Sequence, residues 1–203
     1  MTELSIKQMD LFPTPVWQLE TGIDCKPIKS AVQKLKNHDR VGSKITNVGG
    51  WQSAGLKPTS VDAPKELELL FSLLDKSVKS CLDSIGIPNL VEMKNCWFNI
   101  NKMGNFNKPH NHRESLISGV FYIQTPKDCG NISFERHDHS QYFIPEDLEY
   151  RNFITGGVVT LEVKQGLLVL FPSWLIHEVE PSQSQTPRIS MSFNYNVKDK
   201  ENG

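Results

Sequence analysis

The sequence lacks a long apolar run, an excess of charge of either sign and a signal peptide. No stretch approaches the roughly 18 consecutive apolar residues of a membrane-spanning helix, and the N-terminus has no basic segment followed by an apolar one. The chain carries 22 basic and 23 acidic side chains, so no global field favours nucleic acid or an anionic membrane. We therefore expect a soluble, cytoplasmic protein with no membrane partner, and nucleic acid as a partner is unsupported.

Paired cysteines are also absent. The four cysteines are widely spaced with no CxxC motif, which fits neither a disulfide framework nor a thiolate zinc site. We expect reduced and mostly buried thiols at all four positions. They are Cys25, Cys81, Cys96 and Cys129.

Length and apolar content indicate one domain. The 203 residues, 38% of them apolar, can bury a substantial core, and no internal repeat interrupts them. We predict a single domain over residues 1–203, with a helical and edge-strand part over about residues 1–90 and a β-rich core over about 91–197. Lys198 to Gly203 are expected to form a free tail.

The first part of the chain predicts an edge strand and helices. Residues 12–17, rich in proline, should be extended. Apolar residues at helical spacing predict an amphipathic helix over 27–38, with His38 in solvent. Residues 49–51 should form a loop. A second helix is expected from Asp62, which can cap it, to Gly86.

After Val91 the pattern changes to short runs rich in β-branched and aromatic residues. Turn signals interrupt them every 8–12 residues. Helices followed by such strands indicate an antiparallel sandwich or barrel with helices against one face.

His110, His112 and Glu114 alternate in the segment PHNHRE. On an extended chain their side chains would share one face, where neighbouring members can hold a metal ion. The alternative is an ordinary polar edge strand, because short metal motifs often arise by chance.

A third histidine follows an apolar strand. The segment GLLVLFP, residues 166–172, reads as a buried strand that leads to Trp174 and His177. His177 is therefore either a hydrogen-bonded core histidine or a ligand placed at the mouth of the barrel.

The next strand alternates strictly. Arg188, Ser190, Ser192 and Asn194 share one face, and apolar residues occupy the other. If the polar face points inward, the buried guanidinium needs an anionic partner, because burying a charge without one costs several kcal/mol. If it points outward, Arg188 simply faces solvent.

Several of these segments resemble the Fe(II)/2-oxoglutarate-dependent oxygenase superfamily. The segment NKMGNFNKPHNH, residues 101–112, is similar to the prolyl-hydroxylase-type pattern Tyr-x-x-Gly-x-x-x-x-Pro-His-x-Asp. Segments 118–123, 130–134 and 166–177, followed by Arg188-x-Ser190, resemble the later strands in order and spacing. The opening LFPTPVW also resembles a subgroup of these oxygenases from marine bacteria and phages.

The resemblance implies a double-stranded β-helix (jelly-roll) barrel, mainly β and buttressed by N-terminal helices. It implies a dioxygenase (hydroxylase) that uses Fe(II), 2-oxoglutarate and O₂, with an unidentified prime substrate. The implied metal ligands are His110, His112 and His177, and the implied cosubstrate-binding residues are Arg188, Ser190, Tyr122 and Asn101.

Two positions depart from the family pattern. His112 replaces the usual aspartate, so the expected two-histidine, one-carboxylate set becomes three histidines, unless Glu114 or water takes the third place. Asn101 stands where a tyrosine is common.

Two other functions stay open at this stage. The same histidines could serve a cupin-like metal enzyme without a cosubstrate, or the barrel could be a non-catalytic module that has lost its acidic ligand. The pair His137 and His139 is assigned to a loop rather than to the metal site. Loops near 39–60 and 135–156 are expected to contact the prime substrate, and a homodimer is kept open as a further partner.

Overall fold

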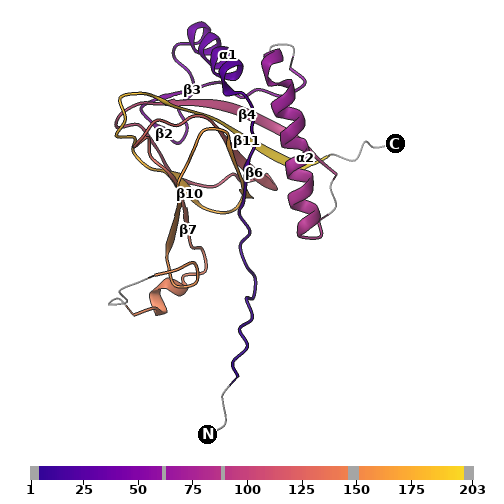
Figure 1. The fold of residues 1–203 in the computed structure, drawn as a ribbon, viewed down its shortest axis with the longest axis vertical. Helices are drawn as coiled ribbons and strands as arrows, with labels where there is room; N and C mark the ends of the chain where they lie inside the picture. The colour runs from indigo at the N-terminus through magenta and orange to yellow at the C-terminus, as the bar shows by residue number, and fades with distance from the viewer. Residues whose placement is uncertain (1–4, 61–62, 88–89, 146–150, 199–203) are drawn as a thin grey trace.

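The computed structural model describes residues 5–60, 63–87, 90–145 and 151–198. They form two antiparallel sheets, whose non-sequential strand orders are those of a jelly roll (Figure 1). The six-stranded sheet has the order β1 (Trp17–Glu20), β9 (Leu167–Pro172), β6 (Ile117–Gln124), β11 (Arg188–Val197), β4 (Val91–Asn101) and β3 (Trp51–Gln52). The five-stranded sheet has the order β2 (Asn47–Val48), β5 (Phe106–His110), β10 (His177–Val179), β7 (Ile132–Glu135) and β8 (Val158–Leu161).

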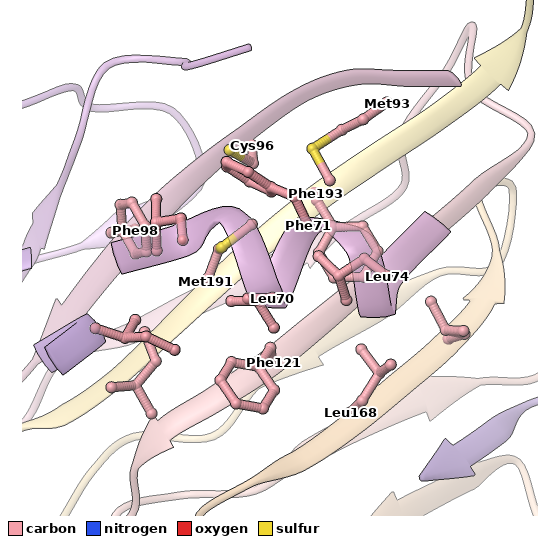
Figure 2. Close-up of a cluster of buried hydrophobic side chains, with 14 of the residues drawn as sticks. Leu70, Phe71, Leu74, Met93, Cys96, Phe98, Phe121, Leu168, Met191 and Phe193 are labelled. Atoms are coloured by element: carbon pink, nitrogen blue, oxygen red, sulfur yellow. The ribbon is translucent and has the colours of Figure 1, made fainter. Parts of the chain in front are cut away.

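The helices cover the outer face of the larger sheet. Helix α1 spans Cys25–His38, and a short 3-10 helix η1, Lys65–Leu67, leads into α2, Glu68–Ser84. Figure 2 shows the side chains of α2 packed over those of the strands, with Leu70 and Leu74 near Phe121 and Met191. This apolar layer holds the larger sheet in place as one wall of the barrel.

The alternation of β11 is confirmed. Ile189, Met191 and Phe193 are buried in the core beneath the helices. The intervening residues, Arg188, Ser190, Ser192 and Asn194, line a cavity between the two sheets. A second apolar cluster, which includes Val120, Tyr122, Phe134, Val169 and Phe171, fills part of the interior beside that cavity.

Several local predictions need correction. The edge strand β1 begins at Trp17, so residues 12–16 precede it rather than form it. Residues 49–51 are not a loop throughout: Gly49 and Gly50, both at positive φ, turn the chain between β2 and β3, and Trp51 is a buried strand residue. Strand β2 pairs with β5 of the five-stranded sheet, and β3 pairs with β4 of the six-stranded sheet. Apolar periodicity in the sequence could not indicate this pairing.

The remaining predictions for this part of the chain hold in outline. Helix α1 begins after Asp24, whose carboxylate accepts a hydrogen bond from the Lys26 amide at 3.0 Å. Asp62, the predicted cap of the second helix, lies outside the described residues, as does the predicted tail beyond Lys198. His38 is exposed.

The four cysteines are free and buried, as expected. Within the described ranges, no helix has the length and apolar content needed to cross a bilayer.

Candidate metal centre

Three histidines meet inside the barrel. His110 ends β5 and His177 begins β10, and the two are directly paired in the antiparallel ladder. His112 follows two residues after the strand ends. One potential ligand atom from each ring lies within 4.8 Å of those of the other two. The ring centroids of His110 and His177 are 4.3 Å apart.

Backbone carbonyls orient two of the rings. The Nδ1 atom of His110 lies 2.7 Å from the Lys108 carbonyl, and that of His177 lies 2.9 Å from the Leu175 carbonyl. A carbonyl only accepts, so Nδ1 carries the proton in both neutral rings and Nε2 keeps its lone pair for a metal. The backbone amide of His112 donates to the Ser173 carbonyl at 2.9 Å, which fixes the loop that carries the third ring.

Burial keeps these rings neutral. Desolvation, with a smaller contribution from His110, lowers the pKa of His112 to about 4. The same two causes lower the pKa of His177 to about 3, and desolvation also lowers the pKa of His110. Neutral imidazole is the form that binds metal, and three of them with free nitrogens suit iron, zinc, copper or nickel. The residues present therefore fit a metal ion.

Glu114 lies outside this cluster. The strand stops at His110, so the expected row of three side chains does not continue to Glu114, which occupies a turn at φ 65°. Its side chain is 83% exposed and its carboxylate lies 3.4 Å from Lys94 Nζ. The turn directs Glu114 toward solvent, away from the imidazoles.

The histidines border a cavity of about 380 Å³, a volume within the usual range of small-molecule sites. Arg188, Ser190 and Tyr122 line the same cavity. Ser190 stands directly opposite Tyr122 in the β11–β6 ladder, which places these three polar groups together on the inner face of the larger sheet.

Arg188 is buried without a carboxylate partner. The side chain is 2% exposed, and Nη1 donates to the carbonyls of Cys129 and Gly130 at 3.0 and 2.9 Å. Within the described part of the chain no carboxylate oxygen lies within 4.0 Å of the guanidinium. Desolvation lowers its pKa from the usual value, but an arginine remains charged at neutral pH. Of the two orientations that the sequence left open, the structure shows the inward one, and a buried cation faces a cavity that can admit an anion.

Asn101 occupies a different place from the one expected. It is buried, and its amide nitrogen donates to Asn107 Oδ1 at 3.3 Å instead of lining the cavity. Asn107 does line the cavity, as do Asn95 and Asn99 on β4. Sequence reasoning missed these residues, although the alternation of asparagine with apolar residues along β4 resembles the pattern that identified β11.

The second histidine pair is separate from the first. The ring of His137 packs edge-on against Trp174 at 4.5 Å, and His139 stacks on Tyr142. Among the described residues, neither joins the metal-type cluster. Of the two loops expected to contact the substrate, residues 43–55 contribute to the cavity lining, whereas the described residues of the second loop, among them 135–138 and 153–154, line a groove elsewhere.

Fold and site together define a double-stranded β-helix protein with a histidine cluster and a buried arginine in its barrel. A family model described as "Putative 2OG-Fe(II) oxygenase" matches residues 95–194. The match covers the barrel region, and the resemblance to 2OG-Fe(II) oxygenases noted in the sequence is confirmed. No curated protein matches the chain.

Solved structures agree on the fold. A prolyl-4-hydroxylase from Pseudomonas putida is 16% identical, with a TM-score of 0.64 over 92% of this chain and 94% of that one. HygX from Streptomyces hygroscopicus, with nickel and 2-oxoglutarate bound, is 12% identical, with a TM-score of 0.61 over 91% and 83%. The viral collagen prolyl hydroxylase of Paramecium Bursaria Chlorella virus-1, in a 2-oxoglutarate complex, is 11% identical, with a TM-score of 0.56 over 89% and 94%.

Proposed function

We propose that this protein is an Fe(II)- and 2-oxoglutarate-dependent dioxygenase that couples oxidative decarboxylation of 2-oxoglutarate to hydroxylation of a prime substrate. The observation that carries the proposal is the pairing of two features in one cavity. A cluster of three imidazoles and a buried arginine that has no described carboxylate within 4.0 Å line the same space. A ligand with a metal-chelating end and a distant carboxylate satisfies both.

His110, His112 and His177 would hold the metal. Their free nitrogens come from a strand end, a loop and the start of the paired strand, so the ladder and the loop contact with Ser173 preorganise them. Iron supplies the capacity to activate O₂ in concert with the decarboxylation of 2-oxoglutarate. Three protein ligands leave coordination positions open for the cosubstrate and oxygen.

Arg188 would bind the distal carboxylate of 2-oxoglutarate. Nη1 is already fixed by two carbonyls, so the guanidinium is held in position before the ligand arrives. A carboxylate there would pair with a guanidinium that has no described carboxylate within 4.0 Å and is influenced by Glu180 only from farther away.

Tyr122 and Ser190 would add hydrogen bonds to this carboxylate. Desolvation raises the pKa of Tyr122 well above its usual value, despite the opposing effect of Arg188, so its hydroxyl stays protonated and can donate. Ser190 contributes a second hydroxyl from the neighbouring strand. Asn101 would act indirectly, by holding Asn107 at the cavity wall.

The buried arginine also weighs against a cupin-like enzyme that needs no cosubstrate. Such a site gains nothing from a buried guanidinium at the cavity wall, whereas burying a charge with no carboxylate within 4.0 Å among the described residues costs free energy.

The direct test is anaerobic loading of the purified protein with Fe(II), followed by 2-oxoglutarate. We expect one Fe(II) per chain, a weak visible charge-transfer band once 2-oxoglutarate is added, and succinate formation when O₂ is admitted. A protein that retains stoichiometric zinc against excess Fe(II), with no band and no succinate, would favour the cupin-like alternative.

A further inference from the structure

The cavity has an unusual polar composition. Among its described lining residues, Arg188 is the only lysine or arginine, and no carboxylate is present. Most of the other polar groups are uncharged amides and hydroxyls. The amides belong to Gln52, Asn95, Asn99, Asn107, Asn111 and Asn194.

Asn99 is the member of this set with a buried side-chain atom that has no hydrogen-bond partner among the described residues. It is 6% exposed, and its amide nitrogen donates to Ser192 Oγ at 3.2 Å. Its Oδ1 is buried and accepts no hydrogen bond, and it is the single buried side-chain polar atom of this kind in the described part of the chain. A buried acceptor in a cavity wall indicates a place where a ligand supplies the missing donor.

One side-chain atom of Asn99 stays unpaired whichever end of its carboxamide is the nitrogen. The Ser192 hydroxyl can donate or accept, so exchanging the two ends of Asn99 would leave an unpaired donor instead of an unpaired acceptor. A hydroxyl or a carboxamide satisfies either arrangement, because each contains both a donor and an acceptor.

The surroundings of Asn99 place such a ligand near the metal centre. Gln52 is paired with Asn99 across the β3–β4 ladder and lines the cavity beside it. Trp97 lies two residues along the same face of β4, and its ring centroid is 5.5 Å from that of His112. A molecule that contacts Asn99 and Trp97 therefore lies next to the histidine cluster.

The charges of the cavity limit what can bind there. An ammonium group would find no carboxylate among the described lining residues. A second anion would find no cationic side chain beyond Arg188 among the described lining residues, and 2-oxoglutarate would occupy both that arginine and the bound metal. Burial without a counter-ion disfavours both.

We propose that the prime substrate is an uncharged molecule that presents a hydroxyl or carboxamide group to Asn99 and Gln52, beside Trp97. Its role as a prime substrate rests on the proposed function, whereas its binding does not. Both a peptide side chain and a sugar carry such groups, and the experiment separates these two sources.

The test uses matched probes on the full chain, loaded anaerobically with Fe(II) and 2-oxoglutarate, with binding followed by calorimetry. One set comprises the N-acetyl methylamides of glutamine, glutamate and lysine, and the other comprises methyl glucoside, its uronate and its 6-amino derivative. We expect the neutral member of one set to bind at least tenfold more tightly than its charged counterparts, and that set identifies the source. Tighter binding of a charged member, or no preference in either set, overturns the proposal.

Substitutions connect the preference to Asn99. Asn99→Asp should weaken binding of the neutral probe at least tenfold and improve binding of the ammonium probe, while Asn37→Asp, which adds the same charge on the exposed face of α1, should change neither. If Asn99→Asp folds poorly, Gln52→Leu supplies a second variant. It should also weaken binding of the neutral probe. If Asn99→Leu weakened binding of 2-oxoglutarate and left binding of the neutral probe unchanged, Asn99 would belong to the cosubstrate site and the inference would be wrong.

The two hypotheses fail in different ways. A neutral preference in protein that produces no succinate would leave this inference standing and refute the proposed function. Succinate formation without that preference would do the reverse.

Discussion

His177 lies directly opposite His110 in the antiparallel pairing of β10 with β5. The backbone register therefore fixes the distance between the two rings before any metal arrives, and each Nδ1 is held by a carbonyl two residues earlier in its own chain segment. His112 reaches the same point from a loop, tied to Ser173 by one backbone hydrogen bond. The site thus combines two rigidly placed ligands with a third whose position depends on the loop.

The ligand set gives the first prediction. His110→Ala and His177→Ala should abolish stoichiometric Fe(II) binding, because each removes a preorganised nitrogen. Glu114→Ala should leave metal content nearly unchanged, since this carboxylate faces solvent beside Lys94. Metal analysis after anaerobic loading and desalting measures all three. Loss of metal in the Glu114 variant would show that the loop rearranges to supply a carboxylate.

The sequence predicted most of the site because β-strand alternation is a strong signal. The division of β11 into a polar and an apolar face could be assigned without a structure, whereas the inward direction of the polar face, and so of Arg188, is seen only in the structure. The end of β5 could not be located, because nothing in the composition of residues 109–114 marks where pairing with β10 stops. As a result, Glu114 was placed on the same face as His110, whereas a turn separates them.

The role of β4 was missed for a different reason. Asn95, Trp97 and Asn99 alternate with apolar residues much as β11 does, but an asparagine carries no charge that demands a partner. Only the packed structure shows that Asn99 Oδ1 remains unpaired, because an unpaired atom is a property of all its neighbours and not of its own strand.

Packing beneath the helices gives the second prediction. Gly119 on β6 has no room for a side chain: a Cβ there would lie 2.5 Å from the Phe193 ring and 2.7 Å from Leu170. Gly119→Ala should destabilise the fold by about 1–3 kcal/mol, the usual cost of overpacking. A thermal melt should show a fall in Tm of roughly 2–4 °C per kcal/mol. Gly55→Ala, where no atom lies within 4 Å of the added Cβ, is the matched control.

The contact between α2 and β11 gives the third prediction. The hydroxyl of Tyr195, a residue 1% exposed, donates to Asp75 Oδ1 at 2.5 Å. Tyr195→Phe should cost about 1.5 kcal/mol of unfolding free energy, the lower value for a hydrogen bond to a charged group, because the exposed carboxylate regains water. Urea denaturation measures the difference. Tyr142→Phe, at a tyrosine that is 78% exposed, should be neutral, and equal losses in the two variants would contradict the assigned contact.

Arg188 gives the last prediction, which separates a 2-oxoglutarate enzyme from other metal barrels. A lysine at this position keeps the charge but cannot reproduce the planar fork that binds a carboxylate through two donors. Arg188→Lys should therefore weaken 2-oxoglutarate binding by at least about 1.5 kcal/mol, the lower value for a hydrogen bond to a charged group, which is roughly tenfold in Kd. Iron content should be unchanged.

The controls for this prediction are a second substitution, a competitor and a remote arginine. Arg188→Ala should bind 2-oxoglutarate still more weakly, and Arg40→Lys, at an exposed position, should bind it as the parent does. Succinate should compete with 2-oxoglutarate in the parent protein, because it retains the carboxylate that Arg188 would hold. Calorimetry on the Fe(II)-loaded protein under anaerobic conditions measures each case. Parent-like binding in both Arg188 variants would mean that the buried cation compensates some other anion, and the proposed oxygenase would lose its main support.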